Sequence, residues 1–179
     1  MRNFFHKLLA EPAEKEKAAL LYGRIMASAR DLAFFTRYGL PDEFETRFEL
    51  LVLHVFLVLN RLEGHGPAAW ALAQALVEML VADLDRTLRE MGVGDVGVAK
   101  RMKHFMEAFY GRARAYHAAL GSNDEKELLR VLDRNLYAAI ATDLVKLKDM
   151  RAYILGRQSQ LKKIALDDFL EGADIFLPA

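Results

Sequence analysis

Three glycines have the spacing of a dinucleotide-binding loop. Gly92, Gly94 and Gly97 fall into the pattern G-x-G-x-x-G. In such a loop the glycines let backbone N–H groups approach a pyrophosphate, but the loop must join a strand to a helix. The residues before Gly92 instead repeat their apolar side chains with the period of a helix. We therefore expect a helix cap at Gly92, a tight loop and a new helix after Gly97, and no dinucleotide site.

The acidic residues and histidines form no metal-binding or catalytic pattern. Asp83 and Asp85 are two positions apart, about 200° around a helix, so they diverge and cannot share a diphosphate-bound metal ion. No two of the five histidines are spaced i, i+4, and no H-E-x-x-H is present. His54 lies in the most apolar segment, where it is either a core histidine with a satisfied nitrogen or a contact for a partner. The sequence predicts no catalytic residue, no cofactor and no metal site.

A cluster of charges surrounds the glycine-rich loop. Lys100, Arg101 and Lys103 lie at the start of the helix expected after Gly97, where a cation opposes the helix dipole at a cost of about 0.3–1 kcal/mol. Cations in such a place indicate an anionic partner, or local pairing with nearby carboxylates. The remaining charged residues of this cluster are Arg86, Arg89, Glu90 and Asp95. Together with His54, these residues are the candidate contacts for a client protein or a membrane.

The elements that carry these residues are predicted to be helices. Apolar periodicity predicts helices over 13–37, 42–63, 68–91, 98–120, 122–141 and 143–163, the last with a break near Gly156, and a short helix near 167–172. Asp42 with Glu45, and Ser122 with Glu125, have the spacing of capping boxes. No alternating strand pattern is present. The fold class is therefore all-α, a single-domain bundle of about six helices.

The helix expected over 42–63 is apolar nearly all round. Such a helix is either central to the core or has a face that waits for a partner. The longest apolar run, Leu50 to Leu59, covers half of the roughly 20 residues that a bilayer-spanning helix needs. The sequence therefore predicts no membrane crossing.

Composition limits the function classes further. The chain has 179 residues with 25 basic and 25 acidic side chains and no cysteine. The balanced charge argues against a nucleic-acid partner bound over the whole chain. The absence of cysteine excludes disulfides, thiolate catalysis and zinc–sulfur sites.

Two stretches have residue patterns that are more specific than the apolar periodicity of a helix. They are Y-G-L-P-D-E-F-E-T-R-F-E-L-L-V-L-H-V-F-L-V-L-N-R-L (38–62) and D-L-D-R-T-L-R-E-M-G-V-G-D-V-G-V-A-K-R-M-K-H-F-M-E-A-F-Y-G-R (83–112). Together they closely resemble the ubiquinol–cytochrome c chaperone family, assembly factors of the respiratory ubiquinol–cytochrome c reductase. The resemblance extends from about residue 20 to 163.

The resemblance implies a chaperone and not an enzyme. Its mitochondrial members are implied to bind newly made cytochrome b beside the membrane, with a small partner subunit and the translating ribosome. The present chain has no evident signal or transit peptide and is similar to the shorter bacterial members, which leaves the partner subunit and the ribosome open. We expect cytochrome b as client, a peripheral contact with the inner membrane from the cytoplasmic side, and no nucleic acid.

We expect three segments along the chain and consider two alternative functions. Residues 1–12 form a basic amphipathic arm, 13–172 the helical chaperone domain and 173–179 a tail. One alternative is a generic helical adaptor for a soluble protein or nucleic acid. The other is a prenyl-diphosphate-handling helical enzyme, against which the missing aspartate pairs argue.

Overall fold

Every regular element in the described residues is a helix. The computed structural model describes residues 12–122, 124–138, 140, 143–171 and 175. The six long helices are α1 (Pro12–Ala29), α3 (Phe44–Leu62), α4 (Gly66–Glu90), α5 (Asp95–Gly121), α6 (Glu125–Asn135) and α7 (Leu144–Lys163). Two short helices, α2 (Ala33–Thr36) and α8 (Leu166–Leu170), join them. The predicted all-α bundle of about six helices is confirmed.

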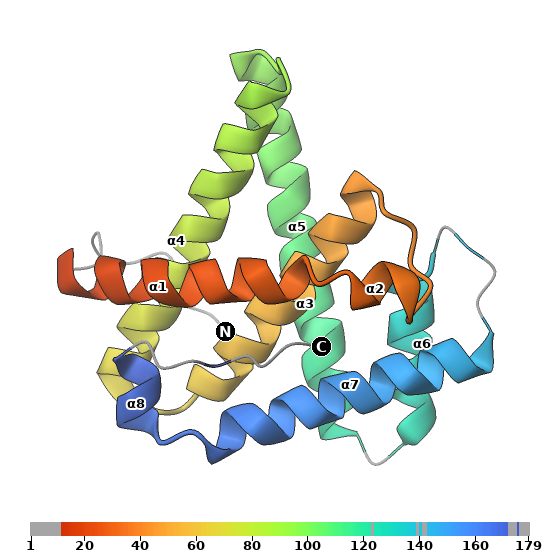
Figure 1. Cartoon of the computed structure of the whole chain (residues 1–179). Coiled ribbons are helices and arrows are strands. Elements are labelled where there is room, and N and C mark those ends of the chain that lie inside the picture. The colour runs from red at the N-terminus through yellow and green to blue at the C-terminus, as the bar shows by residue number, and fades with distance from the viewer. Residues whose placement is uncertain (1–11, 123, 139, 141–142, 172–174, 176–179) are drawn as a thin grey trace.

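Helix α3 lies at the centre of the molecule. Every residue from 48 to 58 is buried, which explains why the helix is apolar nearly all round. Helices α1, α4, α5 and α7 all pack against it. In Figure 1, α1 crosses in front of α3, α7 runs below it, and α5 runs behind it. Of the two readings of this helix, the central core helix is the one that the structure shows.

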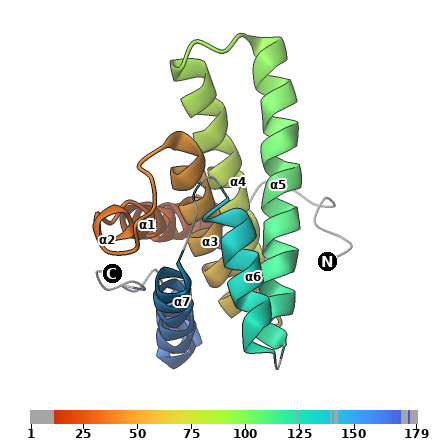
Figure 2. The same cartoon turned by 90° about the vertical axis from the view of Figure 1, so that its right-hand side faces the viewer.

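Helices α4 and α5 form a hairpin that projects from this core. Both views show its closed end standing clear of the other helices (Figures 1 and 2). Gly92 ends α4 with a positive φ of 79°, a left-handed conformation that favours glycine. Its N–H donates to the carbonyl of Arg89 and that of Val93 donates to the carbonyl of Leu88, which is a Schellman motif. The predicted helix cap at Gly92 is confirmed.

The start of α5 differs from the prediction. The helix begins at Asp95 with Gly94 as its N-cap, three residues earlier than expected. Gly97 lies in the first turn, where an added Cβ would come within 2.8 Å of the Val93 side chain. Its lack of a side chain therefore serves close packing of the loop. Lys100 consequently lies in the second turn, beyond the reach of the helix dipole. The prediction that the cations oppose the dipole is wrong.

The first predicted helix is broken in two. The Asp31 side chain accepts a hydrogen bond of 2.9 Å from the N–H of Ala33, a local bond that competes with the helix. The break turns α2 inward and buries Phe34 completely, whereas Leu32 is 72% exposed. The expected continuous helix over 13–37 is therefore wrong between residues 30 and 32.

Both predicted capping boxes and the last long helix, α7, also differ from expectation. Helix α3 has Glu43 at its N-cap without a side-chain cap, and Asp42 instead accepts hydrogen bonds from the Arg47 guanidinium. Helix α6 is capped by Asp124, whose carboxylate accepts the N–H of Lys126, and it ends at Asn135. Helix α7 runs through Gly156 without a break.

Helix α4 is long and apolar enough to cross a membrane, judged by length and composition alone. Its buried residues include Leu72, Leu76, Leu80 and Leu84, which share one face. The helix packs on α1, α3 and α5, as a core helix of a globular bundle does. The predicted basic arm (1–12) lies outside the described residues except for Pro12, and the tail (173–179) except for Ile175.

Candidate functional site

The residues predicted around the glycine-rich loop gather at the closed end of the hairpin. Arg89 of α4 donates to Asp85 at 2.7 Å and to Asp95 of α5 at 2.6 Å. These hydrogen bonds, first the one with Asp85 and then the one with Asp95, raise the pKa of the Arg89 guanidinium. Arg89 therefore ties the two helices together across the loop.

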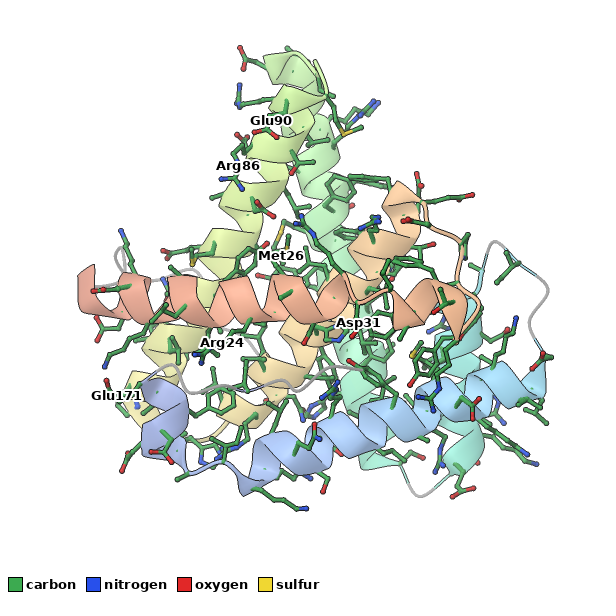
Figure 3. All side chains as sticks on the ribbon, in the orientation of Figure 1. Arg24, Met26, Asp31, Arg86, Glu90 and Glu171 are labelled. Carbon is green, nitrogen blue, oxygen red and sulfur yellow. The ribbon has the colours of Figure 1, made fainter. Side chains whose placement is uncertain are left out.

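Arg86 is paired in the same way on the outer side of α4. It contacts Asp83, which also accepts a hydrogen bond of 3.1 Å from the Tyr22 hydroxyl of α1. The Arg86 guanidinium lies 3.9 Å from Glu90, one turn along (Figure 3). Asp83 and Asp85 thus bind different arginines and do not converge on one point. Four of the predicted residues, Arg86, Arg89, Glu90 and Asp95, are accounted for by local ion pairs.

Three further cations of this region form no such ion pair with any residue that the structure describes. Lys100, Arg101 and Lys103 are exposed, and within the described part of the chain no ion pair involves them. The same part of the hairpin has two exposed apolar side chains, Met91 (57% exposed) and Val96 (87% exposed). We call residues 91–103 the hairpin tip. It combines unpaired positive charge with exposed apolar surface.

His54 lies far inside the molecule and does not join the hairpin tip. Its side chain is fully buried on α3. Its Nδ1 lies 2.7 Å from the Leu50 carbonyl, which can only accept, so this nitrogen carries the proton. Its Nε2, 2.7 Å from the Tyr153 hydroxyl of α7, is then the acceptor. Burial lowers the pKa of His54 to about 4, so the ring is neutral at physiological pH. We therefore leave His54 out of the client-binding surface.

A partly buried ion pair joins α5 to α3 at the base of the hairpin. The Arg112 guanidinium of α5 contacts both carboxylate oxygens of Glu49 on α3, and its Nε lies 2.6 Å from Oε1. Glu49 is 7% exposed. Burial raises the pKa of Glu49, and the pairing with Arg112 opposes that shift. The pair orients α5 against the central helix.

Beyond this pair, an apolar groove opens between α3, α4 and α5. It has a volume of about 690 Å³. The end of α3 forms its floor, and the facing halves of α4 and α5 form its walls. The lining residues are Phe56, Leu59, Asn60, Leu62, Glu63, Gly64, Gly66, Pro67, Trp70, Ala73, Val77, Phe109, Tyr110, Ala113 and His117. We call this the α3–α5 groove.

Sequence reasoning did not find the groove. Trp70, the single tryptophan of the chain, is 42% exposed at its edge. An exposed tryptophan next to Gly66 and Pro67 is a signal that a sequence offers, because aromatic residues are enriched in binding sites. The walls carry alanines, Ala73 and Ala113, which look like ordinary helix residues in a sequence.

Polar groups gather at one end of the groove. His117 Nδ1 lies 3.2 Å from Asn60 Oδ1 and 3.5 Å from the Glu63 carboxylate. Glu63 is the one acidic residue in the lining, and its side chain is 57% exposed. The remaining surface of the groove is apolar. The arrangement can bind an apolar segment and provides no nucleophile with an adjacent base.

The described residues contain no group of three or more His, Asp or Glu side chains that could hold a metal ion. The structure brings the predicted charged residues together at the closed end of the hairpin, separates His54 from them, and adds the α3–α5 groove. The two surfaces lie on the same pair of helices, the tip at the closed end and the groove toward the core.

Comparisons with known proteins agree with this architecture. A family model described as ubiquinol-cytochrome C chaperone matches residues 36–176. The chain is similar to the crystal structure of the Cbp3 homolog from Brucella abortus, with a TM-score of 0.80, 38% identity and 89% and 88% of the two chains covered.

The curated relatives from animals are named as assembly factors of the ubiquinol-cytochrome c reductase complex. Ubiquinol-cytochrome-c reductase complex assembly factor 1 of Xenopus laevis is 28% identical over 144 residues, 80% of this chain and 68% of that protein. The Homo sapiens factor of the same name is 26% identical over 144 residues, 80% of this chain. The chain spans about two thirds of the frog protein and 46% of the human one.

Proposed function

The chain belongs to the ubiquinol-cytochrome C chaperone family, and from this premise we propose that it assists assembly of ubiquinol–cytochrome c reductase by binding cytochrome b. The curated relatives are named as assembly factors of that complex. The observation that supports a client of this kind is the α3–α5 groove, whose walls are apolar and open to solvent. A protein that holds an apolar client before assembly needs such a surface.

We further propose that the chaperone works at the membrane edge through the hairpin tip. The exposed side chains of Lys100, Arg101 and Lys103 suit anionic headgroups, and each cation near such a surface contributes about 1 kcal/mol. Exposed Met91 and Val96 can enter the interface beside them. The projection of the hairpin in Figure 2 lets its tip reach a flat surface before the core does.

A generic adaptor for a soluble protein is the competing function. It would need the same helical scaffold, and it would not need an apolar groove next to a cationic tip. A prenyl-diphosphate enzyme needs carboxylates that converge on metal ions, whereas Asp83 and Asp85 are held by different arginines.

Affinity capture from detergent-solubilised host membranes tests the proposal. The tagged chaperone should retain cytochrome b as its main partner, and deletion of the gene should lower assembled reductase while other respiratory complexes persist. Normal levels of haem-loaded cytochrome b in the deletion strain would contradict the proposal. A soluble protein as the main partner would favour the adaptor.

A further inference from the structure

The dimensions of the α3–α5 groove limit what it can hold. Its α4 wall runs from Pro67 to Val77 and its α5 wall from Phe109 to His117. At 1.5 Å per residue these walls are about 12–15 Å long, which corresponds to two to three turns of a helix. The last part of α3 lines the space between these walls, and Trp70 of the lining is 42% exposed.

Small side chains keep this space open. Ala73 on the α4 wall is 8% exposed and Ala113 on the α5 wall is 9% exposed. Larger side chains at these two positions would themselves occupy the groove. Large aromatic residues, among them Phe56, Phe109 and Trp70, line the rest. A partner side chain can therefore enter between the alanines and pack against rings.

The charge of the lining selects the chemistry of the occupant. The walls carry no formal charge, so they suit an apolar segment. The polar end carries the Glu63 carboxylate, with His117 beside it. An occupant with a positive side chain at that end would complement Glu63, and one with a negative side chain would be repelled.

We propose that the α3–α5 groove seats one end of an apolar helix, about two to three turns long, with a basic residue at the Glu63 end. This inference rests on the proposed function and deepens it. A spanning helix has about 20 residues, so the groove covers only part of one. Basic residues flank such helices on the cytoplasmic side, which matches the charge of the groove's polar end.

The single tryptophan supplies a direct test. Trp70 lies on the groove, and no other residue of the chain gives tryptophan emission. The probe is a tryptophan-free Leu/Ala helical peptide of about 15 residues with two lysines at one end. Binding in the groove should shift the Trp70 emission to shorter wavelength in a saturable way. The matched peptide with two glutamates should bind at least about tenfold more weakly, and equal binding would contradict the charge assignment.

Two variants on one helix separate the groove from the rest of the surface. Ala73→Leu fills the groove, and Ala82→Leu makes the same change on an exposed position nine residues, or about 180°, further round α4. We expect Ala73→Leu to weaken peptide binding at least about tenfold and Ala82→Leu to leave it unchanged. Circular dichroism checks that both remain folded. If Ala73→Leu does not fold, Ala113→Leu fills the groove from the opposite wall. Unchanged binding in a folded groove variant would overturn the proposal.

Capture of cytochrome b with the same variants keeps the two proposals apart. Loss of cytochrome b with Ala73→Leu but not with Ala82→Leu supports both. Equal capture by the wild type and Ala73→Leu overturns the groove as the client seat and leaves the chaperone function standing. If the wild type captures no cytochrome b while the peptide binds as expected, the client assignment fails and the helix-binding groove remains.

Discussion

The stability of the fold should fall in mild acid because of His54. Its pKa is about 4 in the folded protein against an ordinary value of 6.5, chiefly because burial disfavours the charged ring. Nearby Arg157 lowers the pKa further, while the Leu50 carbonyl and Asp31 raise it. Since the folded pKa is depressed, the unfolded chain takes up the proton first. The stabilisation is present above pH 6.5 and is lost as pH falls from 6.5 toward 4.

The size of this effect follows from the two pKa values. The full difference of about 2.5 units corresponds to roughly 3 kcal/mol, and between pH 7 and pH 5 the loss is about 2 kcal/mol. Protonation would also give the Nε2 atom a proton to donate, so that the 2.7 Å hydrogen bond from the Tyr153 hydroxyl must reorganise. A loss of this size is a large part of the stability of a typical domain.

Urea unfolding followed by circular dichroism at pH 7 and pH 5 measures the effect. His54→Gln removes the titrating ring, so its loss between the two pH values should be about 2 kcal/mol smaller than that of the wild type. The matched control is His104→Gln, because the His104 side chain is 89% exposed. His104→Gln should lose as much stability between pH 7 and pH 5 as the wild type does.

Glu49 also makes the stability of the fold depend on pH, so the effect of His54 must be measured by comparing the wild type with His54→Gln. Burial raises its pKa, so this group stabilises the fold below its ordinary pKa and loses that contribution as pH rises through the folded value. The free energy of unfolding of the wild type therefore contains a His54 contribution that rises with pH and a Glu49 contribution that falls with pH. Equal losses in the wild type and in His54→Gln would refute the argument from burial, and would mean that the ring is hydrated in solution.

Four further variants test other features of the structure by the same urea unfolding. Replacing Lys100, Arg101 and Lys103 with Gln should change stability by less than about 0.5 kcal/mol, because they lie beyond the first turn of α5; a larger gain would restore the dipole argument. Gly92→Ala should cost about 1–2 kcal/mol through its positive φ, and Gly92→Asn less; equal stability would mean that the cap rearranges. Arg112→Met should cost about 2–4 kcal/mol at pH 7 by stranding a buried carboxylate, and a smaller loss at pH 5 would show that this carboxylate takes up a proton.

Local patterns in the sequence predicted most of the helices correctly, together with the cap of α4 at Gly92 and the end of α7 at Lys163. Apolar periodicity locates the long helices because a buried helix face repeats every three to four residues. Gly92 could be identified as a cap because a left-handed residue after a helix is usually glycine. Gly97 was misread, because its reason is contact with Val93 and not a turn, and a sequence does not distinguish the two. The start of α5 and the dipole argument were wrong for that reason.

Contacts between distant residues could not be predicted in the same way. The partner of His54 is Tyr153, 99 residues away, so the pattern indicated a core histidine without showing what satisfies it. The α3–α5 groove depends on the relative placement of three helices, and Ala73 and Ala113 become informative only once both are seen to line it. Its one local signal was the exposed Trp70 beside a helix start.

The hairpin tip and the α3–α5 groove lie on the same two helices, and their separation makes their roles independent. The stretch of α5 between Lys103 and His117, at the charged end of the groove, is about 20 Å long, twice the Debye length of about 10 Å at 0.1 M salt. Charges at the tip therefore cannot change affinity in the groove directly. The triple Gln variant of the tip should lose sedimentation with vesicles that contain phosphatidylserine and keep the peptide affinity measured through Trp70. Ala73→Leu should lose the peptide affinity and keep the sedimentation with vesicles. A parallel loss in both assays would show one continuous surface and would contradict the division into a membrane contact and a client seat.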